Sequence, residues 1–165
     1  MKKLFLLLTT ALLGFMVGCS YDDTVAENNK IYYTTTDGQK LFPNSTEPSV
    51  FGAILQSNIY ENGVGVLTFD DAITSIGNMA FLYCSTLASI TIPDSVTEIY
   101  QSAFYYCLSL AKVYCKPTTP PTGDGDMFDR NANGRKIYVP TESVDAYKAA
   151  EWWSDYSSAI VGYDF

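Results

Sequence analysis

Few side chains of this chain could do chemistry. Its 165 residues include no His, which is the commonest general base and the commonest metal ligand in proteins. Asp70 and Asp71 are the only acidic pair flanked by apolar residues, and no nucleophile between Ile31 and Tyr60 has a base beside it. We therefore predict that the chain is not an enzyme and holds no cofactor or metal.

One segment imitates a calcium-binding loop. Asp129, Asn131 and Asn133 have the spacing of the first ligands of such a loop. The acidic residue required at the twelfth position is missing, because Pro140 occupies it. Asn-Gly and Asp-Gly pairs are also typical of exposed turns. An ordinary turn is therefore the favoured interpretation of Asp124–Asn133, and calcium binding is the alternative.

The adjacent indoles of Trp152 and Trp153 could stack on the rings of a carbohydrate. They could also close the end of a hydrophobic core, which is the interpretation that we favour.

Three of the four cysteines occupy apolar positions of a recurring pattern. Cys84 and Cys107 are separated by one period of this pattern, which predicts that both are small buried hydrophobic side chains. A disulfide between them is the alternative, and it requires Cα atoms within about 7 Å of each other. The sequence does not decide whether Cys115 is free.

The elements that must position these residues form a repeat. Eight apolar positions of Ile73–Ile92 recur in Val96–Cys115 at a constant spacing of 23 residues. The matching pairs are Ile73/Val96, Ile76/Ile99, Ala80/Ala103, Phe81/Phe104, Cys84/Cys107, Leu87/Leu110, Ile90/Val113 and Ile92/Cys115. A period of roughly 20 to 29 residues is typical of leucine-rich repeats, which stack as successive coils of a solenoid.

The repeat predicts its own strands and stacking. Leu87–Ile92 ends in an alternation of apolar and polar residues, as a half-buried strand does. Phe81 and Phe104 are expected to stack on each other in neighbouring coils. The pattern extends to a partial unit that begins near Leu67 and precedes the first full copy.

A third copy follows with one residue added, because Phe128 comes 24 residues after Phe104. We therefore expect a strand at Lys136–Val139, paired beside Lys112–Cys115.

The pattern L-x-x-I-x-I-P-x-S-V-T-x-I-x-x-x-A-F-x-x-C, which begins at Leu87, resembles the BspA-like leucine-rich-repeat family of surface lipoproteins of the Bacteroides type. The resemblance extends over roughly Leu67–Pro140. It implies a right-handed solenoid with a parallel sheet, and a role in adhesion or in recognition of host proteins and other cells, without catalysis. The family commonly ends with a segment like Ile137–Pro140 followed by one like Ser143–Tyr147, which favours a cap there.

The outward side chains of the sheet form the candidate binding face. If Ile90 and Ile92 point inward, Thr91 points outward, and residues one repeat away share its face. The predicted face consists of Thr68, Thr91, Tyr114 and Tyr138 beside Lys112 and Lys136. Tyrosine provides contact area at low entropy cost, which suits binding. Ordinary cross-strand pairing on a solvated sheet is an equal alternative.

The chain begins with a predicted lipoprotein signal peptide, residues 1–18. A basic start is followed by an apolar run of the length of a signal-peptide core. The run ends in Met16-Val17-Gly18-Cys19, which resembles the bacterial lipobox although Met replaces the usual Leu. The resemblance implies that Cys19 carries the lipid. The acidic pair Asp22-Asp23 resembles the signal for export to the outer face of the outer membrane. We expect an extracytoplasmic, outer-membrane lipoprotein exposed at the cell surface.

Four segments follow the signal peptide: a flexible tether (19–30), a β-rich N-terminal cap (31–66), the leucine-rich repeats (67–140) and a short helical C-terminal cap (141–165). In the first cap we expect a strand at Ile31–Thr36, a hairpin turn at Asp37-Gly38 and a return strand from Leu41. In the last cap Thr141 is expected to cap a helix, and Ile160–Tyr163 is expected to add a closing strand.

The composition limits the partners. A net charge of −8 and a pI near 4.3 argue against nucleic acid, whose phosphates require a basic patch. The favoured function is a lipid-anchored surface protein that binds a host or bacterial surface protein through the sheet. The alternative is a carbohydrate-binding surface lipoprotein that uses Trp152, Trp153 or exposed tyrosines.

Overall fold

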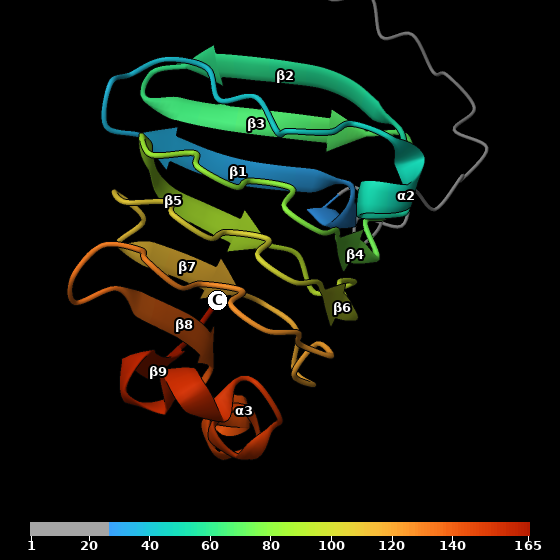
Figure 1. Cartoon of the computed structure of the whole chain (residues 1–165). Helices are drawn as coiled ribbons and strands as arrows, with labels where there is room; N and C mark the ends of the chain where they lie inside the picture. The colour runs from blue at the N-terminus through green and yellow to red at the C-terminus, as the bar shows by residue number, and fades with distance from the viewer. Residues whose placement is uncertain (1–26) are drawn as a thin grey trace, which may run out of the picture.

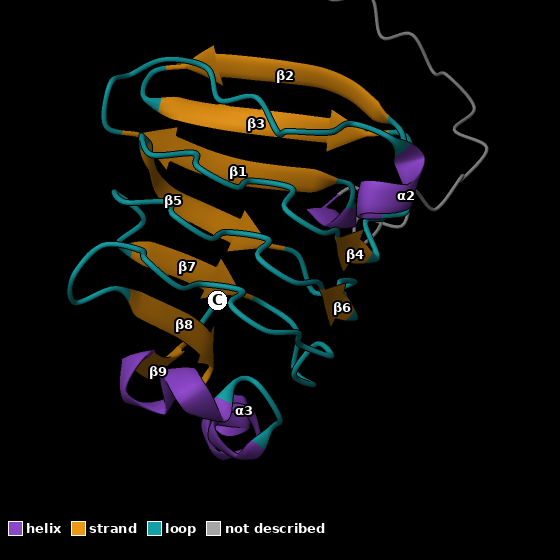
Figure 2. Ribbon diagram, in the orientation of Figure 1, coloured by secondary structure: helices purple, strands orange, loops and turns teal. Residues whose placement is uncertain are grey.

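The computed structural model describes residues 27–165. The signal peptide, Cys19 and most of the expected tether lie outside the described residues. In chain order the elements are β1 (Lys30–Thr35), α2 (Pro48–Phe51), β2 (Leu55–Glu61), β3 (Val64–Phe69), β4 (Ser75–Ile76), β5 (Leu87–Ile92), β6 (Glu98–Ile99), β7 (Lys112–Cys115), β8 (Lys136–Pro140), the 3-10 helix η1 (Thr141–Ser143), α3 (Val144–Ala149), the 3-10 helix η2 (Ser154–Ala159) and β9 (Ile160–Tyr163). Figure 2 shows that strands and loops make up most of the domain.

A seven-stranded sheet runs the length of the molecule in the order β2-β3-β1-β5-β7-β8-β9 (Figure 1). The strands β2, β3, β1 and β5 pair in antiparallel fashion, and β5, β7, β8 and β9 pair in parallel. The parallel register aligns Ile90 with Val113 and Val113 with Ile137. The third repeat strand expected beside β7 is therefore confirmed as β8, in the register predicted from the 24-residue spacing.

Each repeat forms a coil with three sides. The first side is a strand of the long sheet. The second is the short strand β4 or β6 in the first two coils, which pair with each other in parallel, and in the third coil it is Thr122, which forms an isolated bridge with Glu98. The third is a tight corner turn that lies across the core from the sheet. Hydrogen bonds connect the corners of successive coils, as in Phe81 N–H to Ala103 O (2.8 Å) and Phe104 N–H to Met127 O (2.9 Å).

The core contains a ladder of phenylalanine rings under these corners. Phe81 stacks on Phe104 with ring centroids 5.2 Å apart and planes 4° apart, and Phe104 stacks on Phe128 at 5.1 Å and 3°. All three side chains are fully buried. The predicted stacking of Phe81 on Phe104 is thus confirmed, and Phe128 extends it by one coil.

The N-terminal strands differ from the prediction. No return strand begins at Leu41, because its backbone groups bond to side chains instead: its N–H donates to Tyr33 Oη (3.2 Å), and its carbonyl accepts from Asn58 Nδ2 (2.6 Å). The hairpin is β2–β3, which Asn62 and Gly63 connect with φ angles of 52° and 83°. Two successive positive φ angles are typical of the turn that best matches the twist of a hairpin.

The strand β1 occupies a place that the repeat pattern does not predict. It lies between β3 and β5, so the partial unit at Leu67 does not pair with the first full coil. Lys30, expected in the tether, already pairs with Thr68 on β3, and the Asn29 side chain donates to Phe69 O (3.1 Å). The folded domain therefore begins before residue 31.

The C-terminal segment covers the end of the last coil. The closing strand is confirmed as β9, which pairs with β8 in parallel. Thr141 starts the 3-10 helix η1 rather than capping α3, and its hydroxyl donates to Asp164 Oδ1 (2.8 Å). No helix within residues 27–165 is long and apolar enough to cross a membrane.

Candidate binding surface

The outer face of the sheet carries rows of outward side chains, most of them aromatic or apolar. On β7 and β8 the residues Val113 and Ile137 are buried, so the alternating Tyr114 and Tyr138 point outward. Strand pairing joins the row across the parallel strands, from Thr91 to Tyr114 to Tyr138 to Val161. A second part of the row, Ile59–Val66–Tyr32, crosses the antiparallel strands.

Tyr114, Tyr138 and Tyr163 form one aromatic cluster on this face. The rings of Tyr114 and Tyr138 are stacked at 4.9 Å with planes 15° apart. Tyr163 lies edge-on to both, 5.6 Å from each centroid. Phe165 extends the cluster at 5.0 Å from Tyr163. The stacked rings of Tyr114 and Tyr138 therefore cover one face of each other.

The structure brings together five of the six predicted residues of the binding face. Thr91, Tyr114 and Tyr138 share one row, and Ser89, Lys112 and Lys136 form the next. Thr68 is the exception. It pairs with Lys30 on β1, and β1 separates it from β5, so Val66 rather than Thr68 belongs to the tyrosine row.

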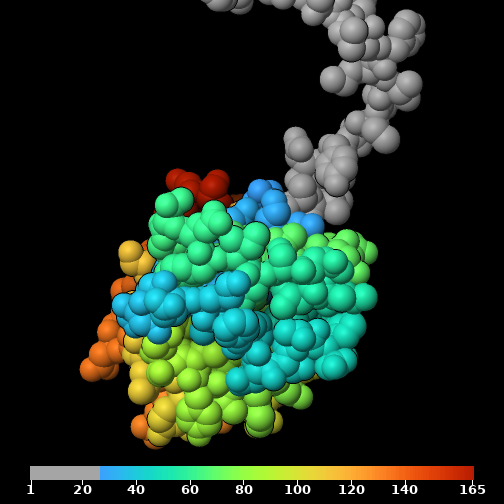
Figure 3. All heavy atoms as spheres, turned by 90° about the horizontal axis from the view of Figure 1, so that it is seen from above, coloured from blue at the N-terminus to red at the C-terminus, as the bar shows by residue number. Residues whose placement is uncertain are grey.

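A shallow pocket of about 330 Å³ opens beside the aromatic cluster. Its lining consists of Thr91, Tyr114, Lys116, Tyr163, Asp164 and Phe165. In Figure 3 the red C-terminal residues lie at the upper margin of the molecule.

The two tryptophans do not form a common platform. Trp153 is fully buried, and its Nε1–H donates to Pro121 O (2.7 Å). Its ring is perpendicular to that of Tyr147 at a centroid distance of 4.8 Å. Trp152, in contrast, is 42% exposed. The favoured interpretation, that both indoles close the end of the core, is therefore correct for Trp153 and wrong for Trp152, and the burial of Trp153 rules out a sugar platform made of both indoles.

The candidate calcium loop is occupied by internal contacts. Asn131 Nδ2 donates to Phe104 O (2.7 Å), and Asn131 Oδ1 accepts from Arg135 Nη1 (3.1 Å). Asp129 Oδ1 accepts from Tyr156 Oη (3.0 Å). Within residues 27–165 no three His, Cys, Asp or Glu side chains converge as metal ligands. These polar side chains therefore have structural partners in the third corner.

The cysteines of the described chain are unpaired thiols rather than a disulfide. Cys107 and Cys115 are buried and Cys84 is half-buried. Burial raises the pKa of Cys84 to about 11 and that of Cys115 to about 12, and it raises the pKa of Cys107 further. Such thiols stay protonated at neutral pH and are poor nucleophiles.

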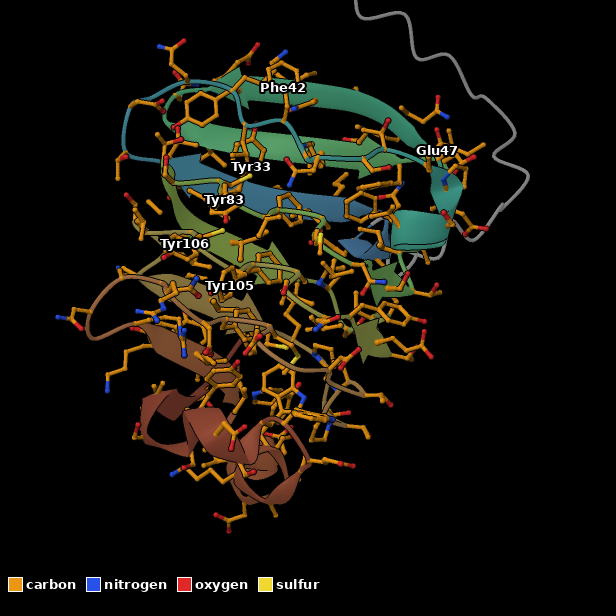
Figure 4. All side chains as sticks on the ribbon, in the orientation of Figure 1. Tyr33, Phe42, Glu47, Tyr83, Tyr105 and Tyr106 are labelled. Carbon is orange, nitrogen blue, oxygen red and sulfur yellow. The ribbon has the colours of Figure 1, made fainter. Side chains whose placement is uncertain are left out.

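A second aromatic surface lies on the corner side, where sequence reasoning did not place a site. Phe42, Tyr83, Tyr106 and Tyr105 follow one another from the β2 end of the molecule toward the β8 end (Figure 4). Tyr83 and Tyr106 lie 5.2 Å apart, and both have positive φ angles of 60°. Their spacing of one repeat was the signal in the sequence, because a side chain that recurs with the period must form a row.

The comparisons with known proteins agree with this architecture. The family model for the BspA type leucine-rich repeat region matches six copies over residues 54–149, which is more than half of the 165 residues. The chain belongs to the BspA-type leucine-rich-repeat family. Repeats of this type suggest a binding scaffold of the protein-interaction or adhesion kind, often associated with the cell surface. Among curated proteins, no sequence matches the chain.

Proposed function

We propose that this protein is a non-catalytic, lipid-anchored adhesion protein that binds a host or bacterial surface protein through the outer face of its sheet. The observation that carries the proposal is the row Thr91–Tyr114–Tyr138–Val161, which continues across all four parallel strands of the sheet. Tyr114 and Tyr138 are half-buried, and tyrosines held in a fixed arrangement provide contact area on binding with little loss of side-chain entropy.

The same geometry argues for a protein partner rather than a sugar. Stacking on a pyranose ring requires a free aromatic face, and the stacked pair covers one face of Tyr114 and one face of Tyr138, while Tyr163 lies edge-on to both. With Trp153 buried, the carbohydrate alternative retains only Trp152 as an exposed indole.

A binding panel tests the proposal. Purified protein is immobilised, and purified extracellular-matrix and bacterial surface proteins are applied at physiological salt. The double variant Tyr114→Ser/Tyr138→Ser should keep its fold and lose at least about tenfold in affinity for any partner that binds the native protein. The matched control is Tyr83→Ser/Tyr106→Ser, which removes a tyrosine pair from the corner side. The proposal would be refuted if the folded Tyr114→Ser/Tyr138→Ser variant kept its affinity for the partner, or if only the control variant lost affinity.

The anchor requires a separate measurement. Cys19 lies outside the described residues, and its lipidation is proposed from the lipobox resemblance. Cells that express the protein should incorporate radiolabelled palmitate into it, and Cys19→Ala should abolish the label.

A further inference from the structure

The outer sheet face is a basic region on an acidic protein. The outward residues of β1, β5, β7 and β8 are Lys30, Tyr32, Thr34, Ser89, Thr91, Lys112, Tyr114, Lys136 and Tyr138. This group contains three lysines and no carboxylate, although the whole chain has a net charge of −8. Lys116 follows β7 at the border of the same face and lines the pocket there together with Asp164. The four central strands of this face therefore carry positive charge alone, while the carboxylates of Glu61 and Asp164 lie at its two ends.

Lys112 and Lys136 are direct neighbours with the same charge. They are paired in register on adjacent parallel strands, and both are exposed. Like charges directly opposite each other destabilise a sheet. Within residues 27–165 the one ion pair joins Lys116 to Glu27 (4.0 Å), so neither Lys112 nor Lys136 is neutralised by a carboxylate of the described chain. The fold tolerates a repulsion that an anionic partner would relieve.

Hydroxyl groups continue the lysine row on the neighbouring strands. Ser89 pairs with Lys112 on β7, and it also pairs with Thr34 on β1. The hydroxyls of Thr34 and Ser89 lie 2.6 Å apart. One of these two hydroxyls donates to the other, so one hydroxyl proton and the two lysine ammonium groups of the row Thr34–Ser89–Lys112–Lys136 remain to donate to carboxylate oxygens.

The two rows of the face favour an extended polypeptide as the occupant. They are separated by two residues along each strand, which is about 6.7 Å. An extended peptide that lies along the strands has the same distance between its side chains i and i+2. One residue would meet the lysine row, and the second would meet the tyrosine row.

We propose that the outer sheet face binds an acidic, extended segment of a protein partner, with carboxylates on the Lys112–Lys136 row and apolar side chains on the Tyr114–Tyr138 row. This inference rests on the proposed function and specifies the chemistry of the partner. A sulfated glycan would also bring negative charge, but the stacked pair covers one face of Tyr114 and one face of Tyr138, which reduces the area on which its rings could stack.

Fluorescence anisotropy with a defined probe tests the inference. The probe is a labelled peptide of three Glu-Thr-Leu-Thr units, and its control has Gln in place of Glu. The native protein should bind the acidic peptide at least about tenfold more tightly than the control, and raised salt should weaken the binding, because exposed charges are screened.

Variants assign the effect to the lysine row. Lys112→Gln/Lys136→Gln should weaken binding of the acidic peptide by about five- to tenfold. The melting temperature of this double variant should be equal to or above that of the native protein, because the repulsion between the two lysines is removed. The matched control, Lys40→Gln/Lys148→Gln, changes two exposed lysines elsewhere, gives the same net charge and should bind like the native protein.

Three results would overturn the inference: equal binding of the acidic and Gln peptides, an equal loss of binding in the control variant, or binding of heparin but not of the acidic peptide. None of these results affects the panel experiment with Tyr114→Ser/Tyr138→Ser. A partner found there without affinity for the acidic peptide would leave the proposed function intact and refute the acidic segment alone.

Discussion

Two residues in every corner turn adopt a left-handed backbone conformation. The φ angles lie between 55° and 61°, and the residues recur at the repeat spacing: Met79, Ser102 and Asp126 at the first position, and Tyr83, Tyr106 and Arg130 at the second. This conformation costs a non-glycine residue roughly 1–2 kcal/mol. The corners are therefore held by the contacts between coils rather than by their own preference.

This strain predicts that Arg130→Gly stabilises the protein. Glycine removes the cost of the left-handed conformation, but it also raises the entropy of the unfolded chain, which destabilises the protein by about 0.5–1 kcal/mol. The expected net increase in the free energy of unfolding is about 0.5–1 kcal/mol. Urea unfolding measures it. Lys148→Gly is the matched control, because Lys148 is an exposed basic residue inside α3, where glycine should cost about 1 kcal/mol. A loss at Arg130 as large as that at Lys148 would show that the turn is not strained.

The buried thiols predict a loss of stability in alkali. Burial raises the pKa of Cys115 to about 12, whereas an unfolded thiol ionises near pH 8.5. Between these values the folded state binds more protons than the unfolded state, so stability falls as pH rises, by about 1.4 kcal/mol per pH unit for this thiol. Urea unfolding between pH 8 and pH 11 should show a smaller decrease for Cys115→Ala than for the native protein. Equal slopes would mean that Cys115 ionises freely in the fold.

At the scale of elements, the sequence predicts the strands that belong to the repeat but not the position of β1, which is inserted between two of the other strands. The strands β5, β7 and β8 and their register follow from the constant spacing of residues such as Ile90, Val113 and Ile137. The insertion of β1 between β3 and β5 leaves no local signal, because strand order depends on contacts between distant segments. That insertion also shifts the row on β3 from Thr68 to Val66, which explains the one misplaced residue of the predicted face.

The packing of β1 against β3 predicts that one methyl group added at Gly65 destabilises the protein. A Cβ added at Gly65 would lie 2.0 Å from Cζ of Tyr33, whose ring is buried against this glycine. The ring cannot move freely, because Tyr33 Oη donates to Asn58 Oδ1 (2.7 Å) and accepts from the Leu41 N–H. Gly65→Ala should therefore cost about 2–3 kcal/mol, measured by thermal or urea unfolding.

Gly125→Ala is the matched control for this change. A Cβ at Gly125 would meet only the ring of Trp152, at 3.9 Å, which is ordinary contact. Its expected effect is within about 0.5 kcal/mol of zero. If both variants unfold at the same denaturant concentration as the native protein, the contact of Tyr33 with Gly65 does not fix the position of β1.

At the scale of the whole molecule, the coils contact mainly their sequence neighbours. The strand β7 pairs with β5 and β8, and Phe104 stacks between Phe81 and Phe128. In such an array the free energy of unfolding is approximately the sum of the intrinsic stability of each coil and the interaction free energy between adjacent coils. One complete coil should therefore be dispensable, since the coils on either side present the same surfaces to each other.

Deletion of Pro93–Cys115, which is one period of 23 residues, tests this property directly. Ile92 would then precede Lys116, β5 would pair with β8, and Phe81 would stack on Phe128. We expect a folded monomer with a native-like circular dichroism spectrum and a lower melting temperature, because one set of neighbour contacts is lost. Deletion of the half-coil Pro93–Phe104 is the control: it breaks the register, so apolar residues of one coil would face solvent in the next, and it should not fold. If the full-coil deletion also fails to fold, stability depends on contacts specific to the deleted coil rather than on the repeated interface.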